Sequence, residues 1–334
     1  MGNKEMVVRF WGVRGSVPSP LTGSQVTEKI NDVLRSFAAN GIDLRGMDEA
    51  KIAAEVAKLP FAMRSTYGGN TTCVEIRCGD DLIICDMGTG IRELGKALIP
   101  EMKANKGLRG TILQSHVHWD HIQGLPFFAP LYTPREFVAN DFDFFGGKAW
   151  DADIETVLRG QMQAPVFPVD LELIKSNAMR MDFKTIYDRW TLKNAGASGF
   201  NVRARVLNHP QETFGYRIMR GGKIIAFTTD HEPYATPDAK LIELVQDADI
   251  WITDCQYSYD IFTGKIGGVP RHGWGHSFPE AIAEAAKIAR PKLIVLTHFD
   301  PDATDQHIIS LSDRVQQVSG IPTIPAYEGL QLAA

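Results

Sequence analysis

The alternation of apolar and polar positions along the chain predicts strands and helices arranged in layers. Short runs rich in apolar and β-branched residues predict strands at 6–11, 72–78, 81–86, 111–115, 201–207, 214–220, 223–229, 249–254 and 292–297. Apolar residues at every third or fourth position predict helices at 25–39, 48–59, 91–98, 154–163, 237–246 and 277–290. Strand pairs followed by alternating strands and helices are typical of a layered α/β domain, so we expect 1–334 to form one domain.

Two segments depart from this alternation. Residues 21–64 hold two amphipathic helices, which we interpret as an inserted helical hairpin with an apolar stripe on each helix. This hairpin could act as a lid, form the contact of a homodimer, or pack on the core as a decoration. Residues 127–192 are rich in Phe, Pro and Asp and only weakly periodic. This composition predicts an irregular excursion on the substrate side, with one helix at 154–163.

Composition places the chain among globular proteins. Its 334 residues are 44% hydrophobic and 22% charged, and no apolar run approaches the roughly 20 residues that span a bilayer. The first ten residues lack an apolar signal-peptide stretch, so we expect a cytoplasmic protein without a membrane partner.

The net charge bears on nucleic-acid binding, and the cysteine pattern bears on the redox state of the thiols. The net charge of −5 disfavours a long nucleic acid, because a long polyanion is usually bound by a basic surface. The four cysteines form no C-x-x-C pair, and three of them lie in or beside strand-like runs. We therefore predict buried, reduced thiols at Cys73, Cys78, Cys85 and Cys255.

The densest chemical signal follows the strand predicted at 111–115. Three of the nine histidines and one carboxylate fall within six residues, as His116, His118, Asp120 and His121. Imidazole and carboxylate ligands together suit a borderline divalent ion such as Zn²⁺, and they also accept Mn²⁺ or Fe²⁺. The pattern therefore predicts a metal site.

Three more candidate ligands stand at strand ends, where a rigid sheet can direct side chains into one cleft. They are His209, Asp230 and His298. Together with the first cluster they make seven ligands, which is enough for two metal ions. We expect one ion to be shared by His116, His118 and His209 and the other by Asp120, His121 and His298, with Asp230 bridging both.

This ligand order resembles that of the metallo-β-lactamase-fold hydrolase superfamily. The resemblance implies an αββα sandwich with a dinuclear metal cleft at one edge of its two sheets. Surrounding motifs resemble the phosphodiesterase branch of that superfamily, near the tRNA 3′-processing ribonuclease RNase Z: Val13-Arg14-Gly15-Ser16, Tyr67-Gly68-Gly69-Asn70-Thr71-Thr72, Asp86-Met87-Gly88-Thr89-Gly90, His118-Trp119-Asp120-His121 and Gly215-Tyr216-Arg217.

The same resemblance assigns further roles in the site. Gly275-His276-Ser277 resembles the loop that carries a catalytic histidine in that ribonuclease, and Asp254 falls where the branch has an acidic residue that orients it. His276 is thus the predicted proton donor, and His272 is a rival four residues earlier. Ser277-Phe278-Pro279-Glu280 reads as a capping box, which predicts a helix start whose N–H groups bind phosphate. We predict substrate contacts at Ser277 and at Asn70.

Departures from related patterns guide the choice of reaction. Asp230 stands where the best-studied zinc β-lactamases have cysteine, and no Gly/Pro-rich basic arm for tRNA is seen. We therefore expect hydrolysis of a small phosphodiester, such as a cyclic nucleotide or short oligonucleotide, by a metal-bridging hydroxide that Asp120 holds in line. A thioester or lactam hydrolase on the same scaffold, and a metal-binding sensor without turnover, remain the alternatives.

Overall fold

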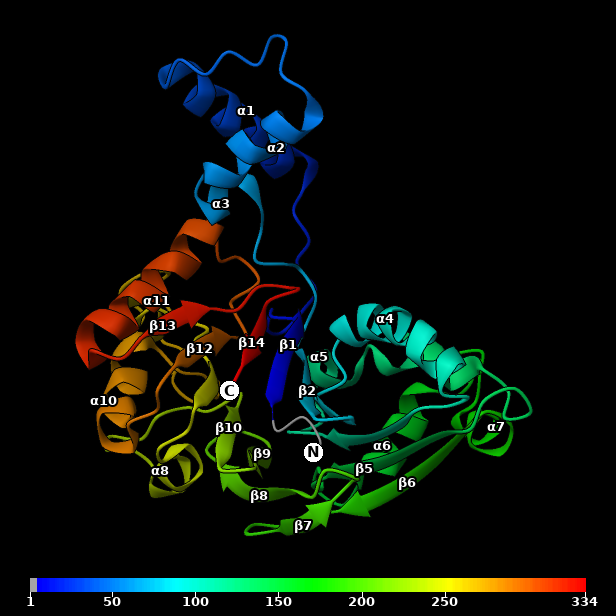
Figure 1. The fold of residues 1–334 in the computed structure, drawn as a ribbon. Coiled ribbons are helices and arrows are strands. Elements are labelled where there is room, and N and C mark those ends of the chain that lie inside the picture. Colours follow the sequence, from blue (N-terminus) through cyan, green and yellow to red (C-terminus); the bar gives the residue numbers. More distant parts are fainter. Residues whose placement is uncertain (1–4) are drawn as a thin grey trace.

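Two seven-stranded sheets lie face to face in the computed structural model, which describes residues 5–334 (Figure 1). The first sheet has the order β14-β1-β2-β3-β4-β5-β6. Its strands are β1 (Met6–Gly12), β2 (Cys73–Cys78), β3 (Asp81–Cys85), β4 (Arg109–Leu113), β5 (Asn140–Gly146), β6 (Met179–Thr185) and β14 (Gln331–Ala333). The second has the order β13-β12-β11-β10-β9-β8-β7. Its strands are β7 (Thr191–Ala195), β8 (Phe200–Leu207), β9 (Thr213–Arg220), β10 (Lys223–Thr228), β11 (Ile250–Asp254), β12 (Ile294–Thr297) and β13 (Thr323–Pro325).

Strand direction determines where the connecting loops meet. In the first sheet β3, β4, β5 and β6 are parallel, whereas β1, β2 and β3 pair antiparallel. In the second sheet β10, β11 and β12 are parallel. Because β8 and β10 both pair antiparallel with β9, β8 runs in the same direction as β10. The carboxyl ends of β8, β10, β11 and β12 therefore lie along one edge of the sheet, where ligands gather in such folds.

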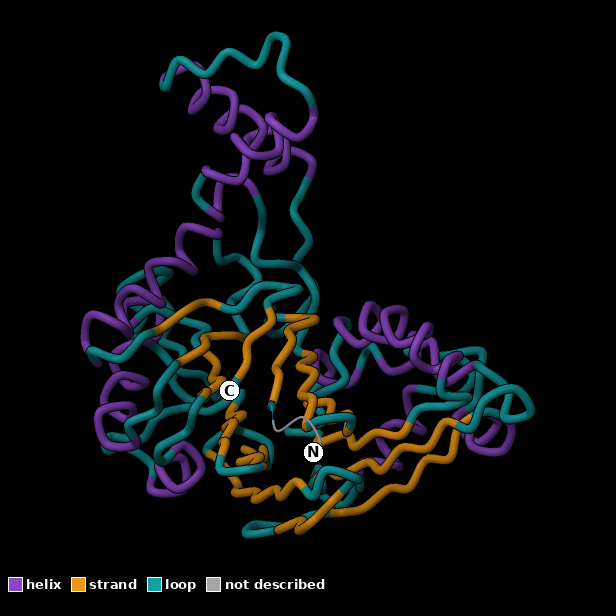
Figure 2. Tube along the Cα trace, in the orientation of Figure 1, coloured by secondary structure: helices purple, strands orange, loops and turns teal. Residues whose placement is uncertain are grey.

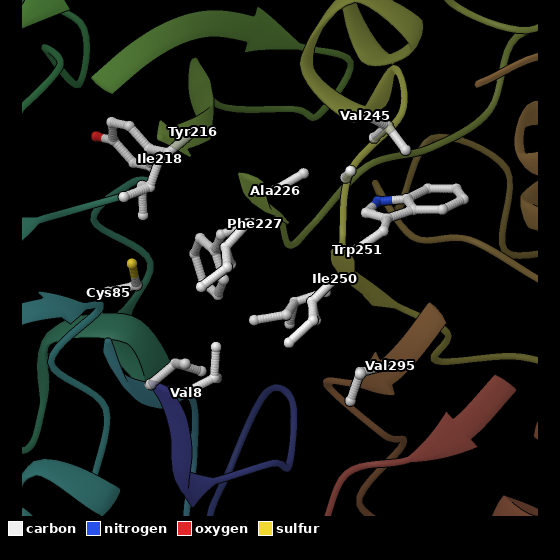
Figure 3. Close-up of a cluster of buried hydrophobic side chains, with 14 of the residues drawn as sticks. Val8, Cys85, Tyr216, Ile218, Ala226, Phe227, Val245, Ile250, Trp251 and Val295 are labelled. Atoms are coloured by element: carbon white, nitrogen blue, oxygen red, sulfur yellow. The ribbon is translucent and has the colours of Figure 1, made fainter. Parts of the chain in front are cut away.

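The main core fills the space between the sheets. Figure 3 shows Val8 of β1 and Cys85 at the end of β3 in the first sheet, together with Ile218 and Phe227 of the second sheet. All four side chains are fully buried. Inward-facing residues of two packed sheets interdigitate in this way in a sandwich, and each large side chain buried contributes about 1.5–3 kcal/mol.

Helices cover the outer faces, as the tube in Figure 2 shows. The longer ones are α4 (Gly90–Ala104), α6 (Ile154–Gln161) and α7 (Leu171–Asn177) over the first sheet, and α8 (Ala239–Val245), α10 (Pro279–Ala289) and α11 (Asp305–Ser319) over the second. Short turns are α5 (Trp119–Ile122), α9 (Tyr259–Phe262), η1 (Leu125–Phe127) and η2 (Ala129–Tyr132). The order helix, sheet, sheet, helix confirms the predicted αββα sandwich.

The helices predicted within 21–64 are present and project from the sandwich, in blue at the top of Figure 1. They are α1 (Gly23–Ala39), α2 (Glu49–Lys58) and the short α3 (Phe61–Arg64). The side chain of Thr22 caps α1 and that of Asp48 caps α2. Local capping and periodicity thus account for both helix starts.

The prediction of irregular structure across 127–192 was wrong. The segment contributes β5 and β6 to the first sheet and α6 and α7 to its outer face, so only the helix near 154–163 was correctly predicted. Both strands alternate apolar with charged residues, and the charges pair across the strands: Lys184 Nζ lies 3.1 Å from Asp143 Oδ1. Such cross-strand pairs support the register. The helix α11 and the strands β7, β13 and β14 were also not predicted.

The structure also bears on the predicted state of the cysteines and on membrane-spanning helices. The four cysteines are buried free thiols, as predicted. Across residues 5–334, no helix has both the length and the apolar character that crossing a bilayer needs.

Candidate metal centre

All seven predicted ligands converge at the edge where the parallel strands end. His116, His118, Asp120 and His121 lie on the loop after β4 and in the first turn of α5. The other three each follow a strand of the second sheet: His209 after β8, Asp230 after β10 and His298 after β12. The facing sheets thus supply the two halves of the cluster.

One group consists of three imidazoles. The Nε2 atom of His116 lies 2.9 Å from Nδ1 of His118, which in turn lies 3.0 Å from Nε2 of His209. The three ligand atoms all lie within 4.8 Å of one another, so they could hold one metal ion. This is the group expected from the sequence for the first ion.

A second group joins Asp120, His121 and His298. Nε2 of His298 lies 3.1 Å from both Nε2 of His121 and Oδ2 of Asp120. Asp230 lies between the two groups, because its Oδ2 is 3.6 Å from Nε2 of His116 and 3.3 Å from Nε2 of His121, and its Oδ1 is 3.3 Å from His298. Asp230 therefore has its carboxylate oxygens near ligand candidates of both groups.

Burial prepares the first group for a metal. Desolvation lowers the pKa of His116 well below its ordinary value, lowers that of His209 to about 4, and shifts that of His118 in the same direction. These imidazoles are therefore neutral at pH 7. Neutral imidazole is the form that binds a metal ion, so the protonation state fits the predicted role.

The second group concentrates negative charge. Burial alone would lower the pKa of His121 and His298, but the carboxylates of Asp230 and Asp120 outweigh burial and raise both values. Burial would raise the pKa of Asp120, yet His121 and His298 hold it below its ordinary value. The carboxylates thus stabilise positive charge at this point, which a divalent cation would also supply. This combination of imidazole and carboxylate donors fits Zn²⁺, Mn²⁺ or Fe²⁺.

Hydrogen bonds behind the cluster fix the orientation of its imidazoles. The fully buried Asp86 accepts from Nδ1 of His121 at 2.8 Å and from the N–H of Ser115 at 2.7 Å. Nδ1 of His209 lies 3.0 Å from the carbonyl of Gly275, and Nδ1 of His298 lies 3.1 Å from Oε1 of Gln256. Such partners hold the other ring nitrogen toward a metal.

The roles of Asp86 and Gln256 were not predicted from the sequence. Asp86 ends the strand predicted at 81–86, and strand-end carboxylates were already the signal used for Asp230. That same signal could have identified Asp86. For Gln256 the sequence offers no comparable signal.

Three residues at the centre have left-handed backbone conformations. The φ angles of Asp86, Asp230 and His298 are 63°, 53° and 56°. Asp86 and His298 come immediately after a strand, and Asp230 comes two residues after one. The side chains of Asp230 and His298 belong to the cluster, and that of Asp86 supports it. A residue other than glycine in this region costs of order 1–3 kcal/mol, and such strain is typical of functional sites.

The predicted proton donor lies beside the cluster. Nδ1 of His276 is 3.5 Å from Oδ2 of Asp254 and 3.9 Å from Oδ2 of Asp230. Within the described part of the chain this buried nitrogen has no hydrogen-bond partner. His272 instead is exposed and its ring contacts Phe262, with centroids 4.4 Å apart. The structure therefore brings His276, and not His272, to the metal centre.

The capping box predicted at Ser277 was wrong. The helix α10 begins at Pro279, its N-cap residue is Phe278, and no side chain caps it. Oγ of Ser277 donates to the carbonyl of His231 at 2.9 Å, and its N–H donates to Asp254 at 2.8 Å. Both groups are used within the protein, so the structure gives Ser277 a role in supporting Asp254, and its substrate contact stays a prediction.

Asn70 is likewise engaged within the protein. Its Nδ2 donates to Oε2 of Glu328 at 3.1 Å, and its N–H donates to Oε1 of the same side chain at 2.7 Å. Its carbonyl accepts from the N–H groups of Val13 and Arg14. These contacts tie the loop before β2 to the C-terminal segment, so the structure gives Asn70 a structural role, and its substrate contact stays a prediction.

The chain is similar in sequence to one protein family and to a curated ribonuclease. The family model of the β-lactamase superfamily domain matches residues 82–299, which run from β3 to the residue after His298. Ribonuclease Z from Staphylococcus saprophyticus subsp. saprophyticus is 33% identical over 113 residues, a match covering 32% of this chain and 30% of that protein. The chain therefore matches less than a third of the length of this curated relative.

Solved structures resemble the whole chain. The metallo-β-lactamase fold protein YhfI from Bacillus subtilis has a TM-score of 0.60 at 17% identity, covering 99% of this chain and 100% of its own. A diphosphatase from the PhnP family has a TM-score of 0.59 at 18% identity, covering 98% and 97%. At these identities the likeness is one of fold. With the family match over more than half of its length, the chain belongs to the β-lactamase superfamily, a fold family of metal-dependent hydrolases.

Proposed function

We propose that the protein is a dinuclear metal-dependent phosphodiesterase that hydrolyses a small phosphodiester, such as a cyclic nucleotide or a short oligonucleotide. The observation that carries this proposal is His276, a buried imidazole whose Nδ1 has no hydrogen-bond partner among residues 5–334, beside seven metal-ligand candidates. Two matched proteins, a ribonuclease and a diphosphatase, are named for cleaving phosphate bonds and support the same chemistry.

Two divalent ions, Zn²⁺ in the first place and Mn²⁺ or Fe²⁺ with the same donors, are part of this proposal. The first ion would be held by His116, His118 and His209. The second ion would be held by Asp120, His121 and His298. Asp230 would bind both ions. When bound, such a pair supplies Lewis-acid polarisation of the phosphoryl group and an acidified water as nucleophile. The net charge of −5 favours a small diester over a long nucleic acid as the substrate.

The chain's own residues supply orientation and a proton. Oδ2 of Asp120 accepts the N–H of Ser16 at 2.7 Å, which fixes this carboxylate against the second group. Asp254 is held by the N–H groups of His231 and Ser277 and faces Nδ1 of His276. The carboxylate of Asp254 lies 3.5 Å from Nδ1 of His276 and orients this ring beside the cluster, from where the imidazole would donate a proton to the leaving oxygen. Proton donation of this kind is worth about 10²–10⁴-fold.

The test uses bis(p-nitrophenyl) phosphate and metal-reconstituted protein, with Asp120→Ala and His276→Ala as variants. We expect metal-dependent turnover that Asp120→Ala abolishes. His276→Ala should keep two ions per chain, lose little activity on this good leaving group, and lose about 10²-fold or more on a diester with an alkoxide leaving group. No turnover with two ions bound would contradict the proposal and direct attention to thioesters and lactams. Loss of one ion in His276→Ala would make His276 a ligand, since it lies near Asp230 and His298.

A further inference from the structure

The segment that carries His276 is rich in glycine. Between α9 and α10, five glycines have positive φ angles: Gly264, Gly267, Gly268, Gly273 and Gly275. Glycine permits many backbone conformations, so such a segment has a high entropy when it is unrestrained. A proton donor must nevertheless stay within hydrogen-bond reach of the leaving atom. Contacts from outside the segment must therefore hold it in place.

Glu232 makes those contacts. Its Oε1 accepts the N–H of Gly273 at 2.9 Å, and its Oε2 accepts the N–H of Gly275 at 2.8 Å. Its backbone N–H donates to the carbonyl of Asn208 at 2.8 Å, and its own carbonyl accepts from Nδ2 of Asn208 at 2.9 Å. Glu232 thus joins three segments: the one that continues into His209, its own segment after Asp230, and the one that leads to His276.

The position of Gly275 affects two parts of the site. Its carbonyl lies 3.0 Å from Nδ1 of His209, and its φ angle is +89°. A Cβ atom on this residue would lie 1.9 Å from Nδ1 of His209, so the backbone here packs directly against the imidazole. Any displacement of Gly275 would therefore disturb the orientation of His209 and the position of the adjacent His276.

We propose that Glu232 is a positioning residue of this site. By accepting two backbone amides, its carboxylate restrains residues 273–276 so that His276 faces the leaving oxygen. The carboxylate of Glu232 contacts the backbone of Gly273 and Gly275 and not the reacting atoms or the seven ligand candidates. Glu232 therefore acts through the backbone of residues 273–276. The inference rests on the proposed function for the role of His276, whereas the restraint itself can be measured independently.

The catalytic test uses Glu232→Gln, which replaces one acceptor oxygen by an NH₂ group that cannot accept an N–H. The probes are ethyl aryl phosphates whose leaving groups range from p-nitrophenolate to phenolate. We expect the variant to hydrolyse the p-nitrophenyl ester within about 3-fold of the wild type and the phenyl ester at least about 10-fold more slowly, because only poor leaving groups need the proton. The matched control is Glu284→Gln on the exposed face of α10, which should leave both rates unchanged.

Two results would overturn the proposal. An equal loss on every ester would show a general structural effect, and unchanged rates on every ester would show that Glu232 has no positioning role. If Glu232→Gln does not fold, Glu232→Asp keeps both oxygens but shortens their reach, and the same selective loss is expected.

Hydrogen–deuterium exchange separates this inference from the proposed function. Peptides covering 264–276 should exchange faster in Glu232→Gln than in the wild type, whereas those of β11 should not change. Unchanged exchange in 264–276 would overturn the restraint even if the protein is an active phosphodiesterase. Conversely, a wild type that hydrolyses no diester would overturn the proposed function, and the exchange result would still decide whether Glu232 restrains the segment.

Discussion

The metal centre and the inserted helices α1 and α2 are built in opposite ways. The centre joins side chains far apart in the sequence: His298 lies against Asp120, 178 residues earlier, at 3.1 Å. The inserted helices are stabilised by their own caps. Their contacts with the sandwich include the ion pair between Lys29 and Asp305, whose Nζ and Oδ2 atoms lie 2.6 Å apart. A change in the centre should therefore affect several segments, whereas a change in the insertion should remain local.

The largest effect in this comparison is expected from Asp86→Asn. Both carboxylate oxygens of Asp86 accept hydrogen bonds: Oδ1 from the N–H of Ser115, and Oδ2 from Oγ of Ser115 and Nδ1 of His121. Asparagine has only one acceptor oxygen, so it cannot keep all three contacts. Loss of such a carboxylate behind a metal ligand typically lowers metal affinity about 10–100-fold. Competition with a chelator measures this affinity. The control is Asp80→Asn in the exposed β2–β3 turn, and equal affinities in the two variants would contradict the role of Asp86.

A smaller effect, on folding stability alone, is expected from Lys29→Ala. The substitution removes the ammonium group that pairs with Oδ2 of Asp305, a side chain only 7% exposed, while Oδ1 keeps the N–H of Tyr67. Loss of one partner of a buried charged group costs about 1–3 kcal/mol in the free energy of unfolding. Urea denaturation measures the loss, and metal affinity should not change. Lys51→Ala, which breaks an exposed pair with Asp48, is the control and should cost less than about 1 kcal/mol. Weakened metal binding in Lys29→Ala would argue against a local effect.

The smallest effect on stability is expected from Ile30→Ser. Val26, Ile30 and Leu34 form an exposed stripe on α1, and surface substitutions usually change the free energy of unfolding by less than about 0.5 kcal/mol. The same variant also tests whether the exposed stripe on α1 is the contact of a homodimer. If this stripe is the dimer contact, sedimentation should show a dimeric wild type and a monomeric variant. A dimer in both would place the contact elsewhere.

The seven ligand candidates that the structure brings together could be found from the sequence because they are concentrated in one short motif and at strand ends. His116, His118, Asp120 and His121 fall within six residues, and a strand-end rule located the other ligands. The failure at Ser277 has a physical reason. Its hydroxyl satisfies the carbonyl of His231, a contact formed only by tertiary folding, so the local capping pattern was not used.

The fold shows a similar division between local and tertiary information. Helices α1 and α2 were predicted from periodicity and caps, but periodicity does not say which surface a helix covers. In 127–192 the alternation of Phe with Asp in β5 is a strand signal, but frequent prolines and aspartates nearby obscured it. The charge pairs that support β5 and β6 join residues about 40 positions apart, which no local pattern reveals.

The base of the insertion has a consequence for how this chain can vary. The N–H of Ser19, just before the inserted helices, donates to the carbonyl of Gly69, just after them, at 2.8 Å. The two ends of the excursion are thus already joined, whatever lies between them. The entropy of closing such a loop grows only with the logarithm of its length, at about 0.6 kcal/mol per doubling. Residues 21–64 can therefore change in length, provided that a cation is kept opposite Asp305, while the sandwich and its metal centre keep their connection.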